Sequence, residues 1–160
     1  INELIASQLS LFKAENLQVL WQCGKLYYDR YSSLETGRIK VLKFISQMDL
    51  AYAVADVIIS RAGAGAVSEL SLVGKPVIFI PSPNVAEDHQ SKNAKSIEDK
   101  DAAIMVKESD LDKKFERLFK NLINDSELQK RLSENILTLA KPLAAKTIVE
   151  EVERIDNEVR

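Results

Sequence analysis

The sequence predicts an α/β fold built on a doubly wound parallel sheet. Short apolar runs alternate with segments of helical periodicity along the first two thirds of the chain. These runs are continuously apolar, not alternating, which is typical of parallel strands covered by helices on both faces. A chain of 160 residues with 46% hydrophobic content is long enough for one domain with a sizeable core. We therefore expect a single domain over residues 1–160.

The first part of the chain predicts three strands separated by helices. Apolar residues recur at helical spacing from Leu4 to Phe12, which predicts a helix over residues 2–15. A short apolar run ended by Cys23 and Gly24 predicts the first strand. Strands are expected at 18–22, 39–44 and 57–60, and further helices at 27–33 and 48–54.

The second part continues the alternation and then becomes helical. A helix over 66–73 is ended by Gly74 and Pro76, and a strand over 77–80 is closed by a rigid proline-rich loop. A helix at 88–100 and a short strand at 103–106 complete the alternating region. Three amphipathic helices are expected beyond it, at 111–124, 126–139 and 144–158.

Composition excludes several classes of function. The formal net charge of −2 gives no general electrostatic reason to bind nucleic acid. A single cysteine, Cys23, excludes an internal disulfide, and with His89 as the one histidine no zinc site is expected. No apolar run has the length of a membrane helix and no signal peptide is evident. We expect a cytoplasmic protein, and because the chain begins at Ile1 we expect it to be part of a longer one.

A glycine turn between a buried strand and a helix is the most informative local feature. Small residues from Ala62 to Ala66 follow the strand at 57–60 and let a ligand approach the backbone. The free N–H groups and positive dipole end of the next helix favour an anion there. Glu69, expected in the first helical turn, could accept hydrogen bonds from the vicinal diol of a ribose. The sequence indicates a nucleotide-phosphate site.

A purely structural interpretation of this turn stays open. Glycine-rich turns are common in α/β proteins, and the helix dipole alone favours an acid near a helix start. As a dinucleotide fingerprint the turn is incomplete, because Ser68 stands where the third glycine belongs and the motif follows a late strand. NAD and FAD are therefore not expected.

Three loops are expected to meet at one edge of the sheet. Residues 44–45, 61–65 and 81–90 each lie just past a predicted strand end. Doubly wound sheets bind ligands in the crevice beyond the carboxyl ends of their strands. The convergence of the three loops therefore supports a binding site.

Several segments, in the same order, resemble the MurG family of glycosyltransferases. These segments are Trp21-Gln22 with Gly24-Lys25, Phe44-Ile45 with Met48, Ala53 to Glu69, Gly74-Lys75-Pro76, and Asp88-His89-Gln90 with Asn93-Ala94. The family transfers N-acetylglucosamine from UDP-N-acetylglucosamine to lipid I, giving lipid II for peptidoglycan. The resemblance covers about half of the chain and matches the C-terminal, donor-binding half of that GT-B enzyme, whose two halves are Rossmann-like.

The resemblance implies a role for each residue that matches the family's donor site. Ile45 would contact uracil through its backbone, with Phe44 and Met48 shaping the pocket. Glu69 would hold the ribose hydroxyls, and Gln90 those of N-acetylglucosamine. The diphosphate would be wrapped by Gly63, Ala64, Gly65, Ala66, Val67 and Ser68.

Alternative roles remain for some of these residues and their neighbours. Ile45 and Met48 could simply be core residues. Arg61 could neutralise the diphosphate or pair with an acid structurally. His89 is expected to be a cap or surface group, and Asp88 to cap the following helix.

The resemblance also implies what this chain does not hold. No catalytic residue, metal site or cofactor is expected in it. The lipid I acceptor, the catalytic base and peripheral contact with the inner face of the plasma membrane would belong to an N-terminal domain that is absent. The family's first strand would lie before Ile1, which would leave an unpaired edge on both neighbouring strands.

Two alternatives to this function stay open. Another GT-B transferase could use the same donor half, such as a dolichol-linked N-acetylglucosamine transferase subunit or a diacylglycerol glycosyltransferase. The fold could also serve as a non-catalytic scaffold that binds no nucleotide.

Overall fold

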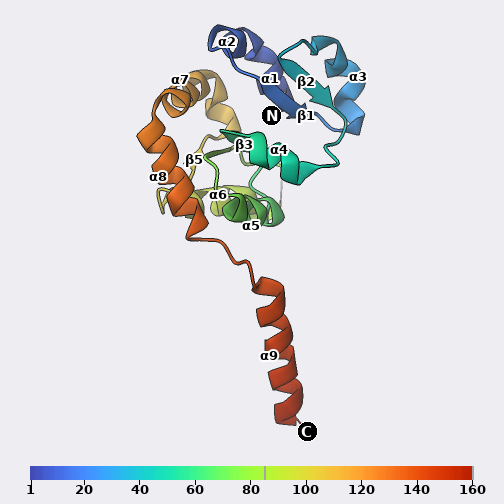
Figure 1. The fold of residues 1–160 in the computed structure, drawn as a ribbon, viewed down its shortest axis with the longest axis vertical. Helices are drawn as coiled ribbons and strands as arrows, with labels where there is room; N and C mark the ends of the chain where they lie inside the picture. Colours follow the sequence, from blue (N-terminus) through green and yellow to red (C-terminus); the bar gives the residue numbers. More distant parts are fainter. Residues whose placement is uncertain (85, 160) are drawn as a thin grey trace.

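The chain folds into an α/β body from which the last helix extends (Figure 1). The structure is a computed structural model that describes residues 1–84 and 86–159. Its strands are β1 (Val19–Gln22), β2 (Ile39–Leu42), β3 (Ile58–Ser60), β4 (Val77–Phe79) and β5 (Ile104–Met105). Its α-helices are α1 (Asn2–Ser7), α2 (Leu9–Ala14), α3 (Tyr28–Tyr31), α4 (Met48–Val54), α5 (Ala64–Val73), α6 (His89–Glu98), α7 (Leu111–Asn124), α8 (Ser126–Leu137) and α9 (Ala144–Val159). Short 3-10 turns occupy Lys25–Tyr27, Ser32–Leu34, Ala86–Asp88 and Glu108–Asp110.

All strand pairs are parallel, as the sequence predicts, but they form two sheets. One sheet has the order β1-β2, with Val19 opposite Ile39, and the other has the order β3-β4-β5. Within the described residues β1 and β3 pair with no strand on the side where the two sheets face each other. The predicted α/β class is confirmed, and in the part of the chain that the structure describes β1 and β3 have the two unpaired edges expected on the neighbours of the family's first strand.

The strand β4 is covered on both faces, which explains its uniformly apolar sequence. Val77 and Phe79 pack with α5, α6 and α8 in one core cluster. Ile78 and the following Ile80 belong to a second cluster that also holds Trp21 of β1 and Val41 of β2. This second cluster joins the two sheets through side chains although no strand pairing joins them.

Several element boundaries differ from the sequence expectation. The helix expected over 2–15 is two helices, because the backbone at Gln8 (φ −100°, ψ 9°) interrupts it. The segment expected as one helix at 27–33 is a succession of 3-10 and α-helical turns. The helix after the glycine turn begins at Ala64 and not at Ala66. The predicted bounds of α4 and α7 are confirmed.

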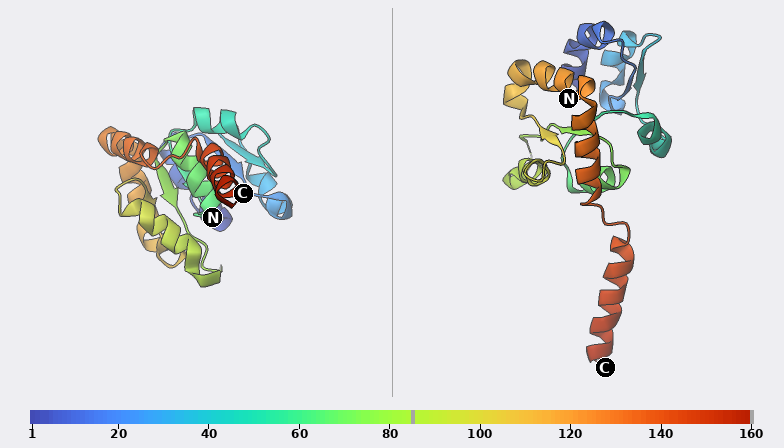
Figure 2. Two further views of the ribbon diagram at one scale, coloured as in Figure 1. Left: turned by 90° about the horizontal axis from the view of Figure 1, so that it is seen from below. Right: turned by 60° about the vertical axis from the view of Figure 1, so that its left-hand side comes forward.

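The helix α9 stands apart from the body (Figures 1 and 2). Side chains 144–158 are all exposed, including Ile148, Val149, Val152 and Ile155. The predicted amphipathic helix is therefore present, but its apolar face is uncovered in this chain. None of the helices described here has the length and apolar character needed to cross a membrane.

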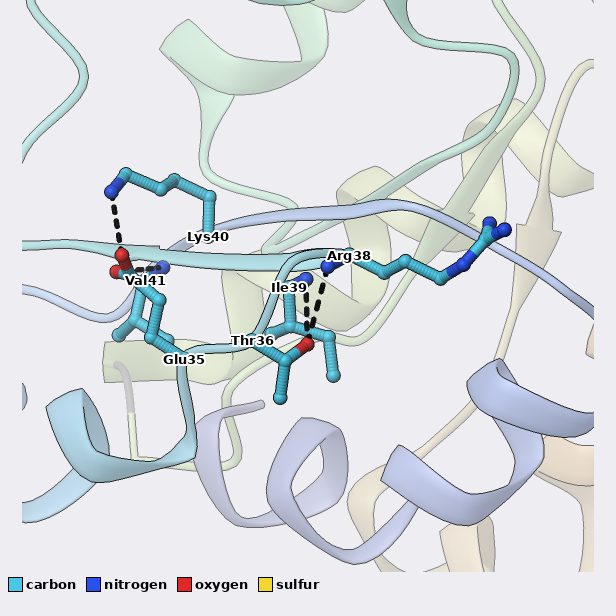
Figure 3. Close-up of polar contacts among 6 residues, drawn as sticks. All are labelled: Glu35, Thr36, Arg38, Ile39, Lys40 and Val41. Carbon is cyan, nitrogen blue, oxygen red and sulfur yellow. Dashed lines mark hydrogen bonds and ion pairs between the residues drawn. The ribbon is translucent and has the colours of Figure 1, made fainter.

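Two side chains fix the start of β2 (Figure 3). The Thr36 hydroxyl accepts hydrogen bonds from the backbone N–H groups of Arg38 and Ile39, both at 3.2 Å. The Glu35 carboxylate accepts from the ammonium of Lys40 at 2.5 Å and from the N–H of Val41 at 3.2 Å. These contacts satisfy donors at the edge of β2 that β1 does not cover, and so hold the strand that leads into Phe44 and Ile45.

Candidate functional site

The N-terminus of α5 presents backbone N–H groups with no partner from its own helix. The chain leaves β3 at Ser60, turns, and enters α5 with Gly63 as the extended N-cap (φ −64°, ψ 149°). The first helical bond runs from the Val67 N–H to the Gly63 carbonyl at 2.9 Å, and no side chain caps the helix. The N–H groups of the three preceding residues therefore point out of the helix start, where they can bind an anion.

The glycines of this turn are not required by the protein's own structure. Gly63 is extended and Gly65 is helical, so neither has a positive φ. A Cβ atom at either position would meet no atom within 4 Å. Neither backbone conformation nor packing explains these glycines, and glycine is the residue that lets a ligand come closest to the backbone.

Glu69 lies in the second turn of α5, not in the first as predicted. It is the sixth residue of the helix because α5 starts two residues earlier than expected. Its side chain is exposed, and burial followed by its negative charge raises the pKa of Tyr52 on α4. Glu69 and Tyr52 line an open groove of about 410 Å³ between the two helices, together with Asp49, Leu72 and Lys75.

The loop after β2 and the first residue of α4 supply the three residues expected around uracil. Phe44 is 71% exposed, and Ile45 and Met48 are half-buried. Ile45 and Met48 belong to neither core cluster. The Ile45 N–H donates to Oε1 of Gln22 at 2.8 Å, so this backbone donor already has a partner. Gln22 lies in a segment that resembles the family, but the sequence predicts no role for it. Its contact with Ile45 spans 23 positions along the chain, and no local pattern indicates such a contact.

The loop after β4 is tied to the glycine turn. Gln90 accepts a hydrogen bond from the Ser82 N–H at 2.9 Å, and Asn93 donates to the Ala62 carbonyl at 3.0 Å. These bonds place the start of α6 beside the start of α5. The expectation that Asp88 caps α6 is wrong, because its backbone is left-handed (φ 54°, ψ 33°) and its side chain makes no cap hydrogen bond. His89 is exposed and lies 3.6 Å from Glu87, which fits the expected surface role.

Arg61 has structural partners. Its guanidinium donates to the carbonyls of Ile80 and Pro81 at 3.0 and 3.1 Å and forms an ion pair with Glu108. These bonds tie the end of β3 to the loop after β4. Of the two roles considered for Arg61, the structure shows the pairing with an acid, and Glu108 could not be identified in advance because it lies 47 residues away.

Direct hydrogen bonds join two of the three predicted loops, because Arg61 and Asn93 connect the second loop with the third. The loop after β2 donates its hydrogen bond to Gln22, and Tyr52 of α4 and Glu69 of α5 line one groove. Across residues 1–84 and 86–159, no three potential metal ligands cluster. Open glycines at a helix start, beyond the carboxyl ends of parallel strands, are typical of α/β domains that bind phosphate-containing ligands.

The sequence matches the glycosyltransferase family 28 C-terminal domain over residues 1–149. The chain belongs to this family.

Two curated relatives with high identity carry the same name. A Flavobacterium psychrophilum protein, named UDP-N-acetylglucosamine--N-acetylmuramyl-(pentapeptide) pyrophosphoryl-undecaprenol N-acetylglucosamine transferase, is 54% identical over 153 residues. The alignment covers 95% of this chain and 42% of that protein. A Christiangramia forsetii protein of the same name is 53% identical over 98% of this chain and 43% of its own length. This chain therefore spans less than half the length of the relatives it matches.

A solved structure supports the same assignment. The crystal structure of Acinetobacter baumannii MurG matches with a TM-score of 0.75 at 29% identity. The match covers 85% of this chain and 42% of the MurG chain. The resemblance to the C-terminal part of MurG, and the GT-B-type fold that it implies, are confirmed.

Proposed function

We propose that this chain is the donor-binding half of an inverting glycosyltransferase that moves N-acetylglucosamine from UDP-N-acetylglucosamine to lipid I, giving lipid II. The observation that carries the proposal is the helix start of α5, where Gly63 and Gly65 leave open space over three free N–H groups. The family membership and the names of the relatives support the same activity.

The proposed site divides the donor among the three loops. The N–H groups at 64–66, with Val67 and Ser68 behind them, bind the diphosphate, and the helix dipole offsets charge that develops on departing UDP. Glu69 accepts hydrogen bonds from the ribose hydroxyls. Phe44, Met48 and the Ile45 backbone surround uracil, while Gln90 binds the hydroxyls of the transferred sugar. Arg61 adds positive charge near the turn while staying bonded to Glu108.

The remaining parts of the enzyme are proposed to lie outside residues 1–160. A strand preceding Ile1 would pair with the facing edges of β1 and β3, and an N-terminal domain would bind lipid I and supply the catalytic base. The relatives' greater length and the two unjoined sheets support this division. We further propose that the protein is cytoplasmic and peripheral on the inner face of the bacterial plasma membrane.

Calorimetry on the full-length gene product tests the donor assignment. UDP and UDP-N-acetylglucosamine should bind and ADP should not. Glu69→Ala should weaken UDP binding by about 1 to 3 kcal/mol, because charged hydrogen bonds to the ribose are lost. Binding of another UDP-sugar in preference to UDP-N-acetylglucosamine would favour a different GT-B transferase. An absence of any nucleotide binding would favour the scaffold alternative.

A further inference from the structure

Tyr52 is notable among the residues near the site because it lies close to Glu69, the residue proposed to bind the ribose. It lies on α4, is half-buried, and packs against the core cluster that contains Leu70, Val77 and Phe79. Tyr52 and Glu69 of α5 line the same groove between the two helices. A ring held by the core on one side therefore presents its polar end to an exposed acid on the other.

A contact that orients an exposed glutamate on a helix favours its action as a ribose ligand. A free glutamate side chain samples several rotamers, and fixing it on ligand binding costs conformational entropy. A phenol with two torsions and an anchored ring can hold the carboxylate in place beforehand. An ionised carboxylate accepts about four hydrogen bonds, so one from Tyr52 leaves acceptors for a vicinal diol.

The placement of Tyr52 also connects two parts of the proposed site. Met48 and Tyr52 are four residues apart on α4 and therefore lie on the same face of the helix. Met48 is expected beside uracil, and Tyr52 faces Glu69. Burial, followed by the neighbouring negative charge of Glu69, raises the pKa of Tyr52, so its hydroxyl stays protonated and able to donate at neutral pH.

We propose that Tyr52 is a positioning residue for ribose recognition, which holds the Glu69 carboxylate toward the 2′- and 3′-hydroxyls of the bound uridine nucleotide. The inference rests on the proposed function, because it takes Glu69 as the ribose ligand. Tyr52 itself touches no ligand in this arrangement.

The test compares UDP with 2′,3′-dideoxy-UDP, which lacks both hydroxyls, by calorimetry on the full-length gene product. Tyr52→Phe keeps the ring and its packing and removes only the hydroxyl. It should weaken UDP binding about three- to tenfold, the scale of one hydrogen bond, and leave dideoxy-UDP binding unchanged. Tyr27→Phe makes the same chemical change on a half-exposed tyrosine and should alter neither affinity.

A double-mutant cycle makes the inference specific to Glu69. In a Glu69→Ala background, Tyr52→Phe should cause no further loss of UDP affinity, because the group it positions is gone. Unchanged UDP binding in Tyr52→Phe, or an equal loss for both nucleotides, would overturn the role of Tyr52. If the unmodified protein binds both nucleotides equally, the ribose role of Glu69 fails and the inference fails with it, while UDP binding itself stands.

Discussion

At the scale of single residues, Gly65 and Gly74 occupy the two ends of α5 and are glycine for different physical reasons. Gly74 is the left-handed C-cap (φ +68°), and a Cβ there would lie 2.5 Å from a methyl carbon of Leu137. Gly65 is helical and has open space around it. The fold requires one glycine and not the other, so substitutions can separate stability from binding.

Gly65→Ala should weaken nucleotide binding without loss of stability. Alanine is better than glycine inside a helix by about 0.5 to 1 kcal/mol, so the free energy of unfolding should stay the same or rise. The added methyl group would occupy the space over the free N–H groups, and UDP affinity should fall at least about tenfold, or 1.4 kcal/mol. Urea unfolding and calorimetry measure the two effects. Full UDP affinity in a stable Gly65→Ala variant would contradict the phosphate site.

Gly74→Ala should show the opposite pattern. A left-handed backbone costs a non-glycine residue about 1 to 2 kcal/mol, and the overlap with Leu137 adds to it. We expect a loss of about 1 to 3 kcal/mol in the free energy of unfolding, measured in urea. Adding Leu137→Ala should recover the part of the loss that arises from the overlap. A Gly74→Ala variant as stable as the unmodified chain would show that α5 and α8 yield at this contact.

The sequence predicted the residues of the turn better than their partners. Small residues and a following helix are a local pattern typical of anion sites, so Gly63 to Ser68 could be predicted as a candidate site. The contacts of Arg61 with Glu108 and of Ile45 with Gln22 depend on how distant segments pack, and no local pattern encodes them. Glu69 was misplaced by one turn, because Ala64 and Gly65 were assigned to the loop when they begin the helix.

At the scale of elements, β2 depends on Glu35 in a way that acid should reveal. Hydrogen bonds from Lys40 and from the Val41 N–H hold the pKa of Glu35 below its ordinary value of 4.5. The unfolded chain therefore binds this proton at higher pH than the folded chain does. The stabilisation is present above pH 4.5 and is lost as pH falls through the lower, folded pKa.

Glu35→Gln should flatten this part of the pH profile. Urea unfolding between about pH 3 and 6 should show a smaller fall in stability for the variant than for the unmodified chain. Glu3→Gln removes an exposed carboxylate on α1 and is the matched control. This variant should lose stability at low pH as the unmodified chain does. If the unmodified chain and Glu35→Gln lost the same stability between about pH 6 and 3, the contact of Glu35 with Lys40 and Val41 would not persist in solution.

Element boundaries were predictable where a chemical signal marks them. Gly74 with Pro76 fixed the end of α5, and a long amphipathic period fixed α7. The break at Gln8 between α1 and α2 carries neither glycine nor proline, so no local signal marks it, and Leu4, Ile5 and Phe12 on either side are buried in the core. The strands are shorter than the apolar runs because pairing, not composition, ends them.

At the scale of the whole molecule, side chains hold together two sheets that share no strand pairing. Trp21 and Val41 of the first sheet and Ile78 of the second lie in one cluster with Phe115 of α7. The fold class was predictable, because continuously apolar runs are typical of parallel strands that helices cover on both faces. The unpaired edges of β1 and β3 among the described residues were also predictable, because the resemblance implies that the strand between these two lies outside residues 1–160.

The helix α9 should contribute almost nothing to the stability of this body. Its apolar residues Ile148, Val149, Val152 and Ile155 are 50–64% exposed, and hydrophobic stabilisation scales with apolar area removed from water. Its ion pairs, such as Arg154 with Glu151 and Glu158, lie within the helix itself. Figure 1 and the right-hand view of Figure 2 both show α9 extending away from the other elements.

Truncation after Leu143 should therefore leave the thermal midpoint of the 160-residue chain within about 1 °C, because no buried contact is removed. The same truncation should reduce binding of an apolar dye and any self-association seen in sedimentation, since it removes a contiguous exposed apolar face. Ile148→Ser with Val152→Ser keeps the helix length and should reproduce the second effect. A midpoint lowered by several degrees would mean that α9 folds back onto the body in solution.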